Sequence, residues 1–343
     1  MKRLVFVSAL LCAALLHIAA PVTAAEVTDA TGRTVTVPDH IERILPAGPP
    51  AAVLLSAIAP AQMIGFPLPV SEAARAALAP AIAGLPMVPR LTGQGEMTAA
   101  TQAMHPDLII DYGTVSPRYK QLAQDTQQKT GIPTLLFDGA LDQIPSVART
   151  LGKILHQPEQ AEAVARFAEA ILALPKPANT NPRVLYARGA DGLTVAAPGT
   201  DVTAIFGRLG WQVVAPDGTG TFRPASVEAI GALDPDIIIL SDPAAKNVLT
   251  TAPWAGLRAV HDGHAYIAPS VPFGWVEEPP SINRLLGLTW LRGGDPLTLA
   301  ALFNSVVYGR VLTQDQLLAI AGTTPSLPGG GIATPPHAVA IKP

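Results

Sequence analysis

The sequence predicts an α/β protein of two lobes, each with a central, mostly parallel sheet flanked by helices, joined by a single long helix. Leu108–Asp111 and Ile237–Leu240 each follow a short helical stretch and a Pro-Asp pair. Both are continuously apolar, which is typical of strands buried on both faces of a parallel sheet. One long helical stretch, Pro158–Leu174, lies between them. Strands alternate with helices on either side of it, and this alternation predicts the two lobes.

The first 25 residues have the features of an export signal and are left out of the fold. It begins with the basic residues Lys2 and Arg3, continues with the apolar stretch Leu4–Ile18, and ends with small residues at the expected cleavage point, Ala24 and Ala25. A retained membrane anchor is the alternative. Cys12 follows Leu11, whereas lipoprotein processing needs a small residue before the cysteine. We therefore expect cleavage near Ala24 or Ala25 and a periplasmic protein that is not a lipoprotein.

The composition of the remaining chain excludes several classes of function. Removal of the signal leaves 21 basic and 26 acidic residues, a net charge of −5, with no basic cluster for nucleic acid. The single cysteine lies in the signal, so no disulfide or thiolate metal site is expected. The chain has no G-x-S-x-G, no H-E-x-x-H, no P-loop and no dinucleotide fingerprint. We expect a protein that is not an enzyme.

The first lobe is predicted to span residues 26–157. Glu26–Val37 alternates polar and apolar residues around Gly32, which indicates a hairpin. The strands expected after it are Ile41–Leu45, Met63–Phe66, Leu108–Asp111 and Thr134–Phe137. The expected helices are Ala51–Ala59, Ser71–Ala83, Thr98–Met104, Tyr119–Thr130 and Ile144–Leu155.

The bridging helix is predicted within residues 158–175. Pro158 suits the first helical position, where its missing N–H costs nothing. Apolar residues recur at helical spacing, Glu162 can pair with Arg166 one turn later, and Pro175 ends the helix. A helix of this length spans about 25 Å, enough to run across two small domains.

The second lobe is predicted to span residues 176–322, followed by a disordered tail at 323–343 that is rich in proline and glycine. The expected strands are Arg183–Ala187, Trp211–Val214, Ile237–Leu240 and His264–Ile267. The expected helices are Val202–Leu209, Val227–Leu233, Trp254–Val260, Ser281–Arg292, Leu297–Val307 and Gln314–Ala321.

Four stretches resemble the helix-bridged (class III) periplasmic substrate-binding proteins of ABC importers, and above all an iron-complex subfamily. They are Tyr266–Leu291, Val306–Leu318, LIIDYGTVSPRY and GIPTLLFDG. The resemblance implies a monomer that binds a metal chelate between its lobes, such as a ferric siderophore or haem. It also implies delivery to a membrane permease with a cytoplasmic ATPase, limited closure of the lobes and no resident cofactor.

The resemblance further implies one exposed glutamate on each lobe that contacts the permease. On the second lobe this position falls on Glu228, eight residues before Asp236. The same spacing before Asp107 gives Ala99, and Glu96, one helical turn earlier, is the expected substitute.

Ligand-binding residues are expected in loops after strands, because ligands bind at the carboxyl ends of parallel strands. Arg188 can bind an anionic group, or can pair with Asp191 at the surface. Tyr112 can contact the ligand, conceivably as an axial ligand of haem iron, or can pack in the core. Either the ligand or a neighbouring helix must cover Trp275. Arg90 and Arg223 are weaker candidates.

The sequence predicts no protein-held metal. The histidines fall in turns and at helix ends, and Glu277 and Glu278 are expected to face solvent before a helix capped by Ser281. A binder of bare metal ions needs several converging His and carboxylate ligands. Two alternatives stay open: a binder of a free metal ion or an oxyanion such as molybdate, and a periplasmic sensor or accessory protein that does not dock.

Overall fold

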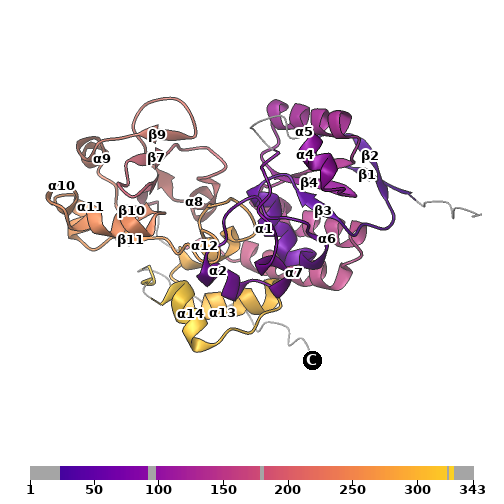
Figure 1. Cartoon of the computed structure of the whole chain (residues 1–343). Helices are drawn as coiled ribbons and strands as arrows, with labels where there is room; N and C mark the ends of the chain where they lie inside the picture. The colour runs from indigo at the N-terminus through magenta and orange to yellow at the C-terminus, as the bar shows by residue number, and fades with distance from the viewer. Residues whose placement is uncertain (1–23, 92–97, 178–180, 323, 328–343) are drawn as a thin grey trace, which may run out of the picture.

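The structure is a computed structural model and describes residues 24–91, 98–177, 181–322 and 324–327. The first half of the chain forms one α/β lobe and the sheet of the second half forms another, with helices between them (Figure 1). The predicted two-lobe α/β fold is confirmed. The structure does not describe residues 1–23, residues 92–97 with Glu96, or most of the predicted tail. No helix in the described part has the length and apolar character needed to cross a bilayer.

The first lobe is built on a parallel sheet of order β3-β4-β5. These strands are β3 (Ile44–Pro46), β4 (Leu108–Gly113) and β5 (Thr134–Asp138). Strand β4 is buried along almost its whole length, as its unbroken apolar sequence predicts. The predicted hairpin is confirmed as a separate pair, β1 (Ala24–Thr28) and β2 (Thr34–Pro38). The Met63–Phe66 stretch makes only isolated bridges, from Met63 to Ile44 and from Phe66 to Met87.

The helices around this sheet follow the predicted order. They are α1 (Pro49–Ile58), α2 (Glu72–Ala77), α3 (Pro80–Ala83), α4 (Thr98–Ala103), α5 (Pro117–Thr130) and α6 (Ile144–Ile154), with short 3-10 turns η1 (Pro60–Gln62) and η2 (Leu141–Gln143). The expected single helix at 71–83 is two helices, since Pro80 begins a new one.

The bridging helix is α7 (Pro158–Leu172). It buries a small-residue face that includes Ala161, Val164 and Ala168 against its neighbours. The predicted Glu162–Arg166 pair forms at 2.8 Å. Arg149 on α6 also reaches Glu162 at 2.7 Å, which ties α7 to the first lobe.

The second sheet has six strands, in the order β11-β10-β6-β7-β9 with β8 paired to β6. Strands β6 (Arg183–Arg188), β8 (Gln212–Val213), β10 (Ile237–Leu240) and β11 (Ala265–Ile267) are parallel and were predicted. Strands β7 (Thr194–Ala196) and β9 (Phe222–Pro224) are antiparallel and were missed. Each has only three residues, which is too short to show a clear alternation of polar and apolar residues.

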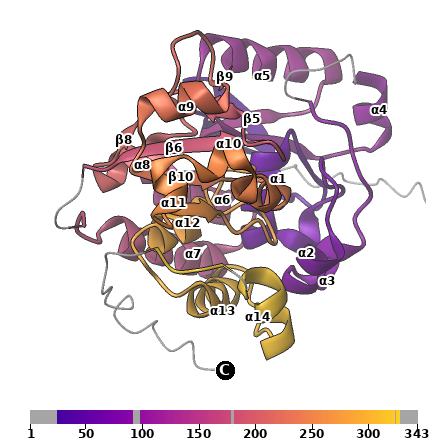
Figure 2. The same cartoon turned by 90° about the vertical axis from the view of Figure 1, so that its left-hand side faces the viewer.

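The helices of the second half include α8 (Ala204–Leu209), α9 (Val227–Leu233), η3 (Pro243–Thr250), α10 (Ala252–Ala255) and α11 (Arg258–His261). The last three are α12 (Arg284–Trp290), α13 (Pro296–Val307) and α14 (Gln314–Ala321). Helix α13 packs against α7, and α14 packs against α2 of the first lobe (Figures 1 and 2). The chain therefore returns to the first lobe after completing the second sheet. The lobe boundaries proposed from the sequence stay predictions.

Candidate functional site

A cavity of about 590 Å³ lies between the two lobes, and we call it the Arg188 cavity. Its walls come from strand ends and the loops that follow them. The first lobe contributes Pro49, Pro50, Leu68, Pro69, Arg90, Asp111, Tyr112, Gly113, Thr114 and Tyr119, and the second half contributes Arg188, Glu278, Pro279 and Pro280. Strands β4 and β6 both end here, as expected for ligand sites at the carboxyl ends of parallel strands.

The guanidinium of Arg188 is already paired inside the protein. Its Nε donates to Glu277 Oε1 at 2.5 Å, its Nη2 contacts Glu277 Oε2, and Glu278 Oε1 lies 2.9 Å from Nε. Its Cζ sits 3.9 Å from the ring centre of Phe222, a cation–π contact. The expected alternative partner Asp191 instead accepts the backbone N–H of Leu193. Arg188 thus lines the cavity as predicted, but with its charge compensated.

Glu277 and Glu278 do not face solvent as the sequence suggested. The Glu277 side chain is fully buried, and Tyr186 donates its hydroxyl hydrogen to Glu277 Oε1 at 3.0 Å. Burial and the neighbouring charge of Glu277 raise the pKa of Glu278, and Arg188 lowers it only in part. Burial opposes the charged form of Arg188, but the hydrogen bond and charge of Glu277 raise its pKa. The two acids neutralise an arginine and do not start a helix.

Ser281 also differs from its predicted role as an N-cap. Helix α12 begins at Arg284, and no side chain caps it. The Ser281 hydroxyl instead donates to the carbonyl of Pro50 on the first lobe at 2.8 Å. The loop before α12 is therefore fastened across the lobes at the edge of the Arg188 cavity.

Asp111 and Arg90 complete the charges of this cavity. Asp111 is 6 % exposed, and burial raises the pKa of its carboxyl to about 6, although the backbone N–H of Tyr112 opposes this. Arg90 is exposed and has no ion-pair partner among the described residues. The lining thus has two arginines and two carboxylates, those of Asp111 and Glu278, and Glu277 pairs with Arg188 from behind the wall, so the site carries no positive excess.

Tyr112 lies in the cavity wall, as predicted, but its side chain is only 1 % exposed. Its hydroxyl has no hydrogen-bond partner in the described part of the chain. Burial raises the pKa of Tyr112 to about 12, against the opposing charge of Arg284. The ring therefore forms part of the cavity wall, and its phenol is buried behind that wall.

Trp275 and Arg223 are not in this site. Trp275 is fully buried and donates its indole N–H to the carbonyl of Val271 at 3.0 Å. Protein therefore covers its ring, which is part of the main hydrophobic core. Arg223 lies on β9, and its Nη1 donates to the carbonyl of Pro216 at 2.6 Å, which holds the preceding loop. Neither side chain lines either of the two cavities described here, and a ligand contact for them stays a prediction.

The permease-contact residues lie away from the cavity. Glu228 is exposed in the first turn of α9, where its own backbone N–H and Ser226 lower its pKa. Ala99 is exposed on α4, and Glu96 lies outside the described residues. The role of both glutamates stays a prediction.

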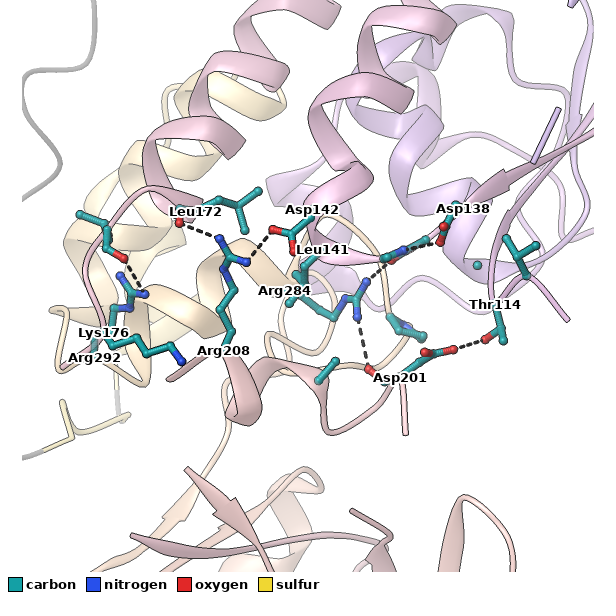
Figure 3. Close-up of a pocket in the computed structure, with 17 residues that line it drawn as sticks. Thr114, Asp138, Leu141, Asp142, Leu172, Lys176, Asp201, Arg208, Arg284 and Arg292 are labelled. Atoms are coloured by element: carbon teal, nitrogen blue, oxygen red, sulfur yellow. Dashed lines mark hydrogen bonds and ion pairs between the residues drawn. The ribbon is translucent and has the colours of Figure 1, made fainter. Parts of the chain in front are cut away.

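A second cavity, of about 790 Å³, shares Gly113, Thr114 and Pro280 with the first, and we call it the Arg292 cavity. It lies between η2, the end of α7, α8 and α12 (Figure 3). Two contacts cross the lobes here: Thr114 donates to Asp201 at 2.6 Å, and Arg208 donates to Asp142 at 2.6 Å. Buried Arg284 donates to the carbonyls of Gly139 and Asp201.

Several of these residues were missed from the sequence. Asp111 stands in the quoted LIIDYG stretch, and a lone acid at the end of an apolar strand was the available signal. In the sequence, Arg284 and Arg292 both fall within the predicted apolar helix Ser281–Arg292, where an arginine needs a buried partner or a ligand. Among the described residues, no group of three or more His, Cys, Asp or Glu side chains is placed to hold a metal ion.

Comparison with known proteins supports the fold and assigns a family. The family model described as "Periplasmic binding protein" matches residues 95–272. Solved structures with the same fold include an ABC transporter solute-binding protein from Sulfurospirillum deleyianum (24 % identity, 87 % of this chain and 99 % of that one, TM-score 0.76). They also include a periplasmic solute-binding protein from Veillonella parvula (25 % identity, 87 % and 97 %, TM-score 0.66).

A third similar structure is the molybdate periplasmic binding protein MolA of Haemophilus influenzae (18 % identity, 84 % and 99 %, TM-score 0.63). A search of curated proteins finds no match to this chain. The family match covers more than half of the chain and includes β4, β6 and their loops, which form much of the Arg188 cavity. The chain belongs to the periplasmic binding protein family.

Proposed function

We propose that this protein is the solute-binding component of an ABC importer and works in the periplasm after its export signal is removed. It captures a metal chelate, most simply an iron(III) complex such as a ferric siderophore or haem, in the Arg188 cavity. It then delivers the chelate to a membrane permease that a cytoplasmic ATPase drives. The protein itself does no chemistry and acts as a monomer.

The charge balance of the Arg188 cavity is the observation that carries this proposal. Glu277 and Glu278 already compensate Arg188, and Asp111 adds a third carboxylate. A bare oxyanion would find only Arg90 without an ion-pair partner among the described residues. A neutral or cationic complex that carries its own coordination shell, such as a ferric hydroxamate, meets no such electrostatic cost. An anionic chelate, such as haem with its propionates or a ferric catecholate, is disfavoured by the same argument.

The size and surface of the cavity support the same conclusion. Its volume of about 590 Å³ lies in the range of small-molecule sites, roughly 300–1,000 Å³. Prolines, Leu68 and the Tyr119 ring give it apolar surface. Structures of the same fold include a periplasmic haem-binding protein of Pseudomonas aeruginosa and an Fe³⁺-hydroxamate transport protein of Saccharomonospora viridis.

Calorimetric titration of the purified protein tests the ligand class. Calorimetry is preferred to intrinsic fluorescence because all four tryptophans are buried and none lines either cavity. The probes are ferric hydroxamate and catecholate siderophores, haemin, cobalamin, Ni-histidine, molybdate and bare metal salts. At least one chelate should bind at micromolar concentration or below, and molybdate and bare ions should not. Tight binding of molybdate or a bare ion, with no response to any chelate, would overturn the proposal.

Glu278→Gln provides a check on the charge argument. Removing this carboxylate leaves Arg188 less compensated, so affinity for a neutral or cationic chelate should fall severalfold while affinity for molybdate rises. Asp315→Asn, at the exposed start of α14, is the matched control and should change neither. A gain in chelate affinity for Glu278→Gln would mean that the bound complex is an anion.

Glu228→Gln separates a docking importer component from a sensor or accessory protein. The side chain is exposed on α9 and remote from both cavities, so ligand binding should be unchanged. Uptake by cells that depend on this protein should drop at least severalfold if Glu228 contacts permease arginines. Unchanged uptake with unchanged binding would favour the non-docking alternative. Asp315→Asn serves again as the control for loss of one surface charge.

A further inference from the structure

The Arg292 cavity contains a buried arginine that is only partly hydrogen-bonded. Arg292 is 6 % exposed, and its Nη2 donates to the carbonyl of Leu174 at 3.2 Å. Its Nε and Nη1 have no partner among the described residues. Leaving buried donors unsatisfied is costly, more so when the group is charged. Buried polar groups in native proteins almost always have a hydrogen-bond partner, from the protein, from water or from a ligand.

Two further cations lie beside Arg292. Arg208 shares its end of the cavity and donates to Asp142, which is largely exposed, and to the carbonyl of Leu172 at 2.8 Å. Lys176 is exposed in the same wall and has no ion pair among the described residues. Figure 3 shows Lys176, Arg208 and Arg292 together at one end of the cavity, with Asp138 and Asp201 at the other. Three cations thus meet one carboxylate.

The positive charges of Arg208 and Arg292 repel each other. Burial lowers the pKa of Arg292, and the positive charge of Arg208 lowers it further. An anion between them would satisfy the free donors of Arg292 and reduce this repulsion. Guanidinium groups bind carboxylate and phosphate oxygens with paired, charge-assisted hydrogen bonds.

We propose that the end of the Arg292 cavity formed by Lys176, Arg208 and Arg292 is a second ligand site, for a compact oxyanion of the phosphate type. This site differs from the Arg188 cavity in charge, because the lining of the latter has as many carboxylates as cations. Its residues come from the stretch after α7, from α8 and from the turn after α12. The bound anion would lie where the bridging helix meets the second lobe.

Calorimetry and thermal unfolding of the purified protein with inorganic phosphate test this site. Phosphate should bind saturably and raise the Tm more than sodium chloride at the same ionic strength. Lys176→Ala should weaken phosphate binding severalfold, and Arg292→Gln tenfold or more. Lys153→Ala, an exposed lysine on α6 outside both cavities, is the control and should bind normally. A salt effect equal to that of phosphate in the unchanged protein would overturn the proposal.

The basal stability of Arg292→Gln distinguishes a ligand site from a purely structural arginine. Without added phosphate, the variant should unfold at the same temperature or higher, since a repelled and unsatisfied charge is removed. A clear loss of basal stability, together with unaltered phosphate affinity of Lys176→Ala, would show that the arginine is structural. Chelate binding in the Arg188 cavity should be retained in both variants. Parallel loss of chelate and phosphate binding would mean one shared site, so this proposal would fail while the proposed function stood.

Discussion

Arg188, Glu277 and Glu278 show how individual residues change meaning when the chain folds. The two acids lie about ninety residues after Arg188 in the chain, yet all three lie within ion-pair distance. Removing one member of such a pair leaves an uncompensated charge in a largely buried place. The cluster therefore sets the charge of the ligand cavity, and no local sequence pattern indicates it.

Asp111→Asn is expected to stabilise the ligand-free protein at neutral pH. The pKa of this carboxyl rises from its usual 3.8 to about 6 on folding, so between these values the folded state keeps a proton that the unfolded chain has lost. The stabilisation that comes from binding this proton more tightly in the folded state is complete below pH 4 and is lost as the pH rises through 6. A shift of this size amounts to roughly 3 kcal/mol.

Thermal unfolding at pH 4 and pH 7.5 checks this expectation. The Asp111→Asn variant should exceed the unchanged protein in Tm at pH 7.5 and match it at pH 4, where the carboxyl is protonated in the folded state. Asp315→Asn should show no such pH-dependent gain. An equal difference at both pH values would indicate a packing effect instead of a titrating buried acid.

Helix α7 is the element on which both lobes depend, and small residues let it approach α6 closely. Gly152 of α6 lies so near Ala161 of α7 that an added Cβ would come within 2.3 Å of the alanine Cβ. Neither atom can rotate away. The sequence predicts α7 from its period and its prolines, but the close α6–α7 contact depends on the tertiary fold.

Gly152→Ala should therefore destabilise the protein despite the better helix propensity of alanine. Overpacking of this kind costs roughly 1–3 kcal/mol, and the rigid contact places this change at the upper end. Gly207→Ala is the matched control, because Gly207 lies in α8 with open space around its Cβ position. That change should be neutral or stabilising by up to about 1 kcal/mol. Denaturant unfolding of both variants measures the contrast, and equal effects would refute the close-packing argument.

The molecule as a whole has two connections between its halves. Helix α7 is one, and the return of α13 and α14 to α7 and α2 is the other. Gln160 reinforces the second connection by donating to the carbonyls of Ala57 and Val307 at 2.9 and 2.8 Å. Two packed connections resist the rotation that a hinge of two strands allows.

Ligand binding should consequently change the shape of the molecule very little. Addition of the chelate that binds in calorimetry should leave the radius of gyration nearly unchanged, because backbone atoms at pre-organised interfaces move by about 1 Å or less on binding. Small-angle X-ray scattering of the free and loaded protein measures this. A contraction of several ångströms would show that the packing of α13 and α14 does not hold the lobes together.

The sequence by itself determined most of the strands and helices in order, the bridging helix and the family resemblance, because these depend on local period, proline positions and contiguous motifs. It also placed Tyr112 and Arg188 at strand ends and named Arg90 in a loop as a weaker candidate, and the structure brings all three to one cavity. Tertiary structure alone decided that Trp275 is covered by protein, that Arg223 holds a loop and that Arg188 is neutralised. Tertiary structure also left Arg292 with free donors beside Arg208. Burial and pairing of charge join residues far apart in the chain, so their outcome follows from packing.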